Sequence, residues 1–524
     1  MNAITAAQSL PPVYTPAVSV QVKAIEQAVS TTQTSPSTSV TLGEAVTAPP
    51  PIYTANGTLG GAQVRYAFEH ESTDKLSSTL LDNIQASASA GGRFKGLGAA
   101  LLAQLAANGG KSISQSVLTV GTEQADAGVL KLQLEHLRAH PASSLSFNLT
   151  TASGATISLS LASGEKGLSV IADVHNGELS SEELEGLAAM ADDFQSAIDG
   201  LTQVPPRLQL GNLVKLDSSL FSSLQLNASL VVSGELQTFD LSLDDSARKL
   251  ALNGPSGRVE MNLDTPSAAL LGSTAQRQAA IDSYLSQFDA ALKRGKGDAN
   301  LMGLFKDAFT QLNAVDERKQ AVSERVSLLS ATDRALLSGL ADFNASISQP
   351  TQHSNPMRLE ESDRFEYQAS QSTTIKNAGG VNRSVQQEQQ AGLKAAYHQG
   401  LNPLTNMQLG LDKESQNYRY HEINDQSSSS TRLAYENNRL VQASATQQAS
   451  QSERVRTYVN ADLVDDVTTP TSATETHDLL NLLTDAFRDE RLARQANDAS
   501  ILDETLQGLR SRWQLQSNPA DIAR

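Results

Sequence analysis

Two histidines four residues apart are the first candidates for metal chemistry. On a helix, His136 and His140 would share a face, but the zinc-peptidase pattern needs Glu directly after the first His, where Leu137 stands. The preceding residues alternate like a strand and Pro141 follows, so we interpret both histidines as surface residues. No acidic cluster accompanies a histidine, so the sequence predicts no metal site and no cofactor.

Two glycine motifs resemble parts of nucleotide sites. GGKS, from Gly109 to Ser112, ends like a phosphate loop, but Leu105 stands where the loop needs its first glycine, and the expected element order is reversed. GLGAAL, which begins at Gly96, carries Leu101 where the dinucleotide fingerprint has its third small residue. We interpret the first motif as a helix end and reject the second as a nucleotide site.

The stretch HNGELSSEELEGL resembles the second half of a calcium-binding loop. Asn176, Gly177 and Glu183 fit that loop, but Ala172 and Val174 occupy two positions that require oxygen ligands. Calcium would be under-coordinated, so the interpretation is a turn followed by a capped helix with acidic residues in its first turn.

Nucleophilic catalysis has no local signature either. The chain contains no cysteine, which excludes thiolate nucleophiles, thiolate metal sites and disulfides. Serines are numerous, but none lies in a G-x-S-x-G elbow. The sequence therefore predicts no catalytic residue.

The sharpest pattern is a repeat near the start of the chain. PPVYTP begins at Pro11 and PPPIYTA begins at Pro49. P-P-x-Y is the ligand pattern of WW domains, which bind polyproline II segments in aromatic grooves. The alternatives are a duplicated linker element and a pair of patches that dock on the folded part of the chain. The candidate interaction residues here are Pro11, Pro12, Tyr14, Pro50, Pro51 and Tyr53.

Charge and hydropathy limit the partners. The net charge of −17 disfavours nucleic acid and anionic lipid, because both attract a surplus of Lys and Arg. No run approaches the roughly 18 apolar residues that span a bilayer, and the first basic residue is Lys23, so no cleaved signal peptide is expected. We expect a soluble bacterial protein, either cytoplasmic or exported without a cleavable signal.

Composition and periodicity divide the first half of the chain into three stretches. Residues 1–60 are rich in Ser, Thr and Pro and are predicted to be disordered. Residues 61–141 predict a small α+β segment that holds a strand, two helices and a second strand. Residues 142–270 predict an antiparallel β-rich domain with one helix. The landmarks are the strand at Val64, Tyr66 and Phe68, the helix cap at Asp74, the helix stop at Asn108, the strand at Leu130, Leu132 and Leu134, and the helix capped by Ser180 or Ser181.

The second half also divides into three. Residues 271–348 predict a helical hairpin or bundle that includes Leu336, Leu340 and Phe343. Residues 349–470, rich in Ser and Gln, predict polar extended structure with partial strand content, which Asp465, Asp466 and Pro470 end. Residues 471–524 predict an amphipathic helical tail. Its candidate interaction residues are Leu479, Leu483, Phe487 and Trp513.

The predicted fold class is α+β: an antiparallel sheet domain with packed helices, a helical segment, and flanking disordered or low-complexity regions. The first functional hypothesis is a non-catalytic interaction or assembly protein, on a bacterial surface or exported without a cleaved signal, with a protein partner or a second copy bound through residues 471–524. The alternatives are an intracellular scaffold or regulator with docking head and tail, and an enzyme whose site is scattered over the sequence.

Overall fold

The computed structural model describes residues 65–120, 126–264, 270–314, 329–378, 380–402, 407–496, 501, 505–506 and 508–523. Residues 62–524 form one compact unit, separate from residues 1–61. The disorder predicted for the head lies outside the described residues.

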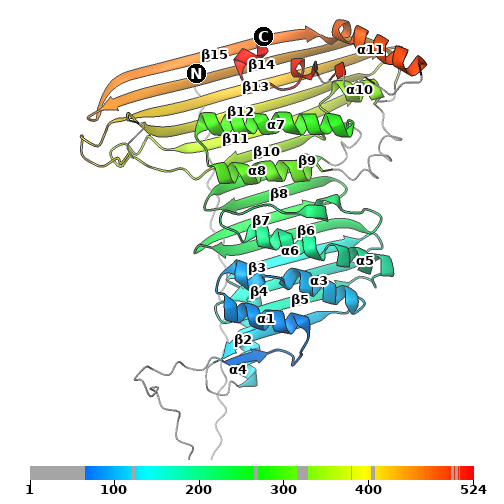
Figure 1. Cartoon of the computed structure of the whole chain (residues 1–524), viewed down its shortest axis with the longest axis vertical. Coiled ribbons are helices and arrows are strands. Elements are labelled where there is room, and N and C mark those ends of the chain that lie inside the picture. The colour runs from blue at the N-terminus through cyan, green and yellow to red at the C-terminus, as the bar shows by residue number, and fades with distance from the viewer. Residues whose placement is uncertain are drawn as a thin grey trace, which may run out of the picture. The chain divides into compact units, whose positions relative to one another are not determined.

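One antiparallel sheet of 15 strands organises this unit, in the order β1-β2-β5-β4-β3 and then β6 to β15 in sequence (Figure 1). An α+β fold is therefore confirmed. The sheet continues through the predicted boundaries at 141, 270 and 348. The strands are β1 Arg65–Phe68, β2 Ile113–Val120, β3 Ser143–Thr151, β4 Thr156–Gly164, β5 Gly167–His175, β6 Phe221–Val232, β7 Glu235–Leu243, β8 Ala247–Gly254, β9 Gly257–Asp264, β10 Phe343–Ser348, β11 Arg364–Lys376, β12 Ser384–Gly400, β13 Tyr418–Glu436, β14 Arg439–Val459 and β15 Asp462–Asp478.

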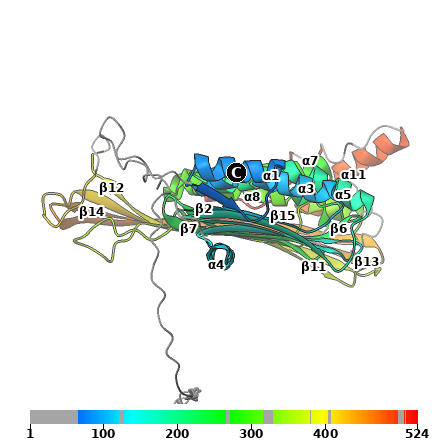
Figure 2. The ribbon, with the colours of Figure 1, turned by 90° about the horizontal axis from the view of Figure 1, so that it is seen from below.

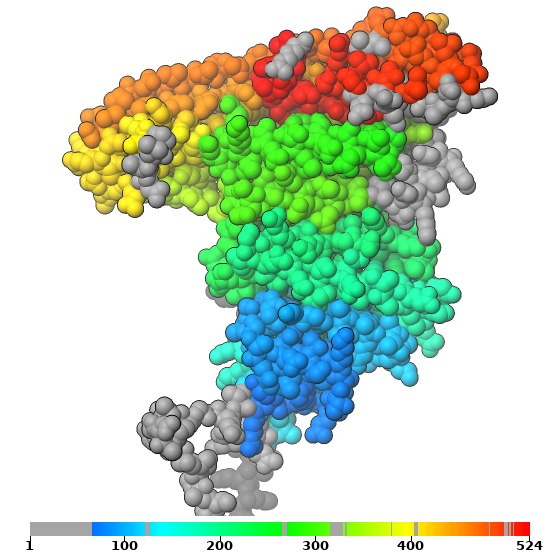
Figure 3. Space-filling model, in the orientation of Figure 1, coloured from blue at the N-terminus to red at the C-terminus, as the bar shows by residue number. Residues whose placement is uncertain are grey.

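Helices cover one face of this sheet, and α4 alone among the labelled helices lies on the other (Figure 2). We call the first the helix face and the second the open face. In the space-filling view of the helix face, the colours run in chain order from blue at one end of the sheet to red at the other (Figure 3). Most parts of the chain therefore lie beside the parts that precede and follow them in sequence. The helices are α1 Lys75–Ala86, α2 Ala90–Phe94, α3 Leu97–Ala107, α4 Ala127–Ala139, α5 Ser181–Ala189, α6 Ala191–Leu201, α7 Thr274–Gly295, α8 Ala299–Leu312, α10 Ala331–Leu336, α11 Leu479–Gln495 and α13 Pro519–Ile522, with 3₁₀ turns η1 Gly211–Lys215 and η3 Arg510–Arg512.

Local helix signals in the sequence are confirmed. Asp74 accepts a hydrogen bond from the backbone N–H of Ser77 at 2.7 Å and caps α1. Ser180 and Glu183 form a reciprocal capping box at the start of α5. At the end of α3, Gly110 has φ of 78° and its N–H bonds the carbonyl of Leu105, the left-handed stop predicted there.

The predicted strand at Leu130, Leu132 and Leu134 is wrong, because these residues lie in helix α4. Leu137 is the only buried residue of this helix on the open face, and Arg138 beside it bonds serine hydroxyls of that face. A helix that buries so little does not require an apolar stripe with helical period. The alternation of leucines with polar residues in this segment therefore did not indicate a strand.

Three boundaries also differ from the predictions. The helix expected after Ser180 breaks into α5 and α6 at Met190. Helix α10 ends at Leu336, and Phe343 begins strand β10. Strand β15 continues through Pro470 to Asp478, so the helical tail begins only at Leu479. The last two corrections reflect pairing of β10 and β15 to other strands, which overrides local propensity.

Polar strands in the second half acquire their register from buried glutamines. On the helix face, Gln371 donates to the carbonyl of Leu340, and Gln387 accepts from the N–H of Ser338. Gln447 donates to the carbonyls of Ser511 and Gln514 at 2.8 and 2.5 Å. These amides bind irregular backbone that would otherwise lie buried without hydrogen bonds. A shift by one residue would turn every one of them to solvent.

Candidate functional site

The structure distributes the predicted interaction residues unevenly. Those of the repeated P-P-x-Y motif lie outside the described residues. Leu479, Leu483 and Trp513 are buried, and Phe487 packs partly exposed against them, in a second core beneath helices α10 and α11. Their apolar surface is covered by the chain itself, and self-association through them stays a prediction.

The near-miss motifs keep their structural interpretations. His136 and His140 do share a face, because α4 is a helix, and their ring centroids lie 5.3 Å apart. Both are exposed, as expected. Glu183 is buried by its capping contacts and accepts from Ser153. Within the described ranges, no three His, Cys, Asp or Glu residues are arranged to hold a metal ion.

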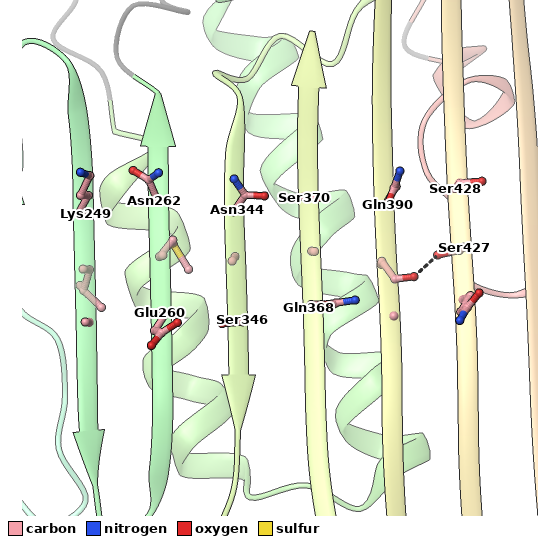
Figure 4. A pocket seen from close by; sticks show the side chains of 18 of the residues that line it. Lys249, Glu260, Asn262, Asn344, Ser346, Gln368, Ser370, Gln390, Ser427 and Ser428 are labelled. Atoms are coloured by element: carbon pink, nitrogen blue, oxygen red, sulfur yellow. Dashed lines mark hydrogen bonds between the residues drawn. The ribbon is translucent and has the colours of Figure 1, made fainter. Parts of the chain in front are cut away.

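Two rows of polar side chains cross the open face from β8 to β15, and we call them the polar rows. Cross-strand pairing sets them side by side (Figure 4). Row one consists of Lys249, Asn262, Asn344, Ser370, Gln390, Ser428, Gln448 and Thr474. Row two consists of Ala251, Glu260, Ser346, Gln368, Gly392, Gln426, Ser450 and Ser472.

The rows line a hollow of about 820 Å³ whose floor is the sheet itself. Six amides reach into it from six different strands, and all six are exposed. None bonds another group of the chain among the residues that the structure describes, whereas the buried glutamines on the helix face are bonded. The six are Asn262, Asn344, Gln368, Gln390, Gln426 and Gln448.

The chemistry of the rows is unusual for an exposed sheet face. From β9 to β15, Glu260 is the one charged residue in the two rows, and neither row holds an aromatic residue. Exposed faces normally carry about 25–35% charged residues, and uncharged amide ladders promote aggregation. Gly392 leaves a gap in the centre of row two, and glycine inside a strand weakens the strand unless something approaches closely.

Elsewhere on the open face, hydroxyl groups already hold a partner within the chain. Arg138 of α4 bonds the hydroxyls of Ser114, Ser116 and Ser169 and pairs with Glu69 at 2.6 Å. This contact covers the face at β2 and β5. Helix α4 thus covers the open face at β2, β4 and β5. Among the described residues, it packs on none of the strands β8 to β15 that carry the polar rows.

A buried ionic cluster fastens the end of the sheet that extends past the helices. We call this end the wing: residues 395–400, 418–422, 454–459 and 462–467, with the loops 349–363 and 407–417 (Figure 1). Glu361 is fully buried there and accepts hydrogen bonds from Tyr418 at 2.6 Å and Tyr458 at 2.8 Å. Arg456 lies 3.2 Å from the same carboxylate.

His398 completes this cluster between two carboxylates, with Nδ1 2.6 Å from Asp363 and Nε2 3.4 Å from Glu361. Burial acts to raise the pKa of Glu361 and of Asp363, but hydrogen bonds, those of His398 included, outweigh it and lower both. Burial acts to lower the pKa of His398, yet the two carboxylates raise it above its ordinary value. The imidazole is fully buried, so it fastens the loop and cannot reach a substrate.

The free edges of the sheet are protected against further strands. Strand β1 is four residues long. Strand β15 contains Pro470, which has no N–H to donate, and five acidic residues, which repel a second copy of the same edge. The open face, and not an edge, is therefore the extended unpartnered surface of the described sheet.

The chain matches no family model, no curated protein and no solved structure. Among the described residues, no helix combines the length and apolar character needed to cross a bilayer.

Sequence reasoning did not find the polar rows or the wing cluster. The sequence showed that Gln and Ser are frequent in the extended segments of residues 349–470. It did not show which residues of each strand face the helices and which face the open side. Glu361, His398 and Arg456 lie far apart in sequence and share no motif. Only pairing of β11 to β14 brings such residues together.

Proposed function

We propose that this chain is a non-catalytic binding protein that holds an uncharged partner on the polar rows. One observation carries the proposal: six exposed amides, unbonded within the described chain, line one hollow that has almost no charge. Each amide offers two donors and an acceptor oxygen, so the hollow presents a dense set of hydrogen-bonding groups to a partner.

A catalytic role has less support. The hollow contains one carboxylate, Glu260, and one amine, Lys249, and no histidine. General acid–base chemistry usually requires two positioned titratable groups with shifted pKa values. The titratable cluster of Glu361, Asp363 and His398 lies in the wing and not in the hollow, and the side chains of Glu361 and His398 are fully buried there.

Capture from cell extract by the immobilised full chain tests the proposal. The double variant Gln390→Ala/Gln426→Ala removes two central amides, and Gln442→Ala removes an exposed amide of β14 outside the hollow. Carbohydrate, protein and small-molecule analysis of the eluates should show material that the wild type and Gln442→Ala retain and the double variant loses. Equal retention by all three would refute a binding role for the rows.

A further inference from the structure

We infer that the partner of the polar rows is an uncharged polysaccharide, whose chain lies across the strands along the rows. This inference rests on the proposed function and names the ligand class for that same site. It follows from what the hollow offers and from what each other class of partner would require.

Charged polymers do not match the rows. Nucleic acid needs several Lys or Arg residues to neutralise phosphates, and the hollow is lined by one lysine, Lys249, and one carboxylate, Glu260. Acidic polysaccharides and anionic membrane surfaces need the same positive charge. With net charge −17, the chain as a whole would also repel them.

Protein partners do not match either. Stable protein interfaces centre on aromatic, Met or Arg anchors, and the rows contain none of these from β9 to β15. An extended peptide binds a sheet by pairing with an edge, but the backbone groups beneath the hollow already pair with neighbouring strands.

Hydroxyl groups match the rows in both chemistry and spacing. A sugar hydroxyl is one donor and two acceptors, which complements amide and serine side chains. Strands lie about 4.8 Å apart, so a chain that crosses them meets a similar set of groups at every strand, a repeat close to one sugar residue in an extended glycan. The hollow is lined from β8 to β14, which spans about 29 Å at that spacing.

Gly392 provides room for this chain at the centre of the floor. A Cβ built there meets Gln368 at 3.4 Å and the carbonyl of Asp425 at 3.7 Å, which are ordinary contacts. The strand therefore accepts a side chain at this position. Gly392→Gln would keep the amide character of the rows while its side chain rises into the hollow and blocks a chain that crosses it.

Affinity electrophoresis and pull-down with defined polysaccharides test the inference on the full chain. The panel contains neutral β-glucan, mannan and chitin, and acidic polygalacturonate. We expect retention by at least one neutral polymer that is unchanged from 0.05 to 0.5 M NaCl, because no ion pair contributes. Oligosaccharide affinity should rise with length until the chain spans the hollow.

Gly392→Gln and Gln390→Ala/Gln426→Ala should each weaken that retention about tenfold or more, and Gln442→Ala should not. Gly392→Ala serves as the folding control, since it adds the Cβ alone. Binding of the acidic polymer only, neutral binding that Gly392→Gln leaves unchanged, or no neutral binding would each overturn the inference. A partner of another class that the wild type binds and the double variant loses would overturn the polysaccharide inference and leave the proposed binding function intact. Dimerisation through the rows, seen by ultracentrifugation, would have the same consequence.

Discussion

Glu361→Gln should open the wing locally. The carboxylate accepts from two tyrosine hydroxyls and faces Arg456 in a fully buried site. The carboxamide keeps one acceptor oxygen, but its NH₂ group replaces the other oxygen, which accepts from a tyrosine hydroxyl. The positive charge of Arg456 also loses one of its two carboxylate partners and keeps Glu422 at 3.3 Å. Removal of one partner from a buried ion pair typically costs about 3–5 kcal/mol.

That cost should appear as local opening, since the wing lies beyond the helices and packs on its own small cluster of Tyr418, Tyr420, Tyr458 and Ala396. At about 1.4 kcal/mol per factor of ten, the open fraction rises by roughly 10²- to 10⁴-fold. Hydrogen exchange followed by mass spectrometry reads this directly in the peptides covering residues 355–363, 416–421 and 456–460.

Glu366→Gln is the matched control, because Glu366 is an exposed carboxylate on β11 whose change should cost under about 0.5 kcal/mol. Unchanged exchange in the wing peptides of Glu361→Gln would show that the carboxylate does not fasten the loop. Equal acceleration in peptides of α1 and α3 would show a global effect and refute the local account.

Four further predictions concern other contacts. Protection of the wing, measured as exchange relative to the unfolded peptides at the same pH, should peak between about pH 5 and 6.5. The lowered pKa values of its two carboxylates give stability that is lost as pH falls, and the raised pKa of His398 gives stability that is lost as pH rises. Protection that stays constant from about pH 4 to 8 would contradict this. Gln447→Ala should cost about 1–3 kcal/mol and accelerate exchange in residues 510–517, while Gln448→Ala, its exposed neighbour, should not; equal effects would refute the assignment of faces. Arg138→Ala should detach α4 and speed limited proteolysis within residues 127–139, and an unchanged cleavage rate would show that Leu137 alone holds the helix. Pro470→Val should restore a donor on the free edge and increase self-association in sedimentation experiments, and a chain that stays as dispersed as wild type would leave the acidic residues as the sufficient barrier.

Prediction from sequence succeeded where the signal was local. Asp74, Ser180 and Gly110 mark helix ends with side chains or backbone angles that depend on a few neighbouring residues. The β-rich character of residues 142–270 was visible because apolar and polar residues alternate in strands such as β3, β6 and β9, whereas no pattern indicated β8. Prediction failed at α4 and at Pro470, where the outcome depends on a distant surface or a distant strand.

By itself, the sequence determined the α+β class and the absence of thiol chemistry, because these follow from composition and short-range periodicity. It did not determine that the rows would be nearly uncharged, because residues 349–470 also contain many charged side chains and only the strand register keeps these out of the rows. Only tertiary structure decided which glutamines are buried and bonded and which face the hollow. Gln447 and Gln448 are identical in chemistry and adjacent in sequence, and the side of the sheet on which the tail packs gives them opposite roles.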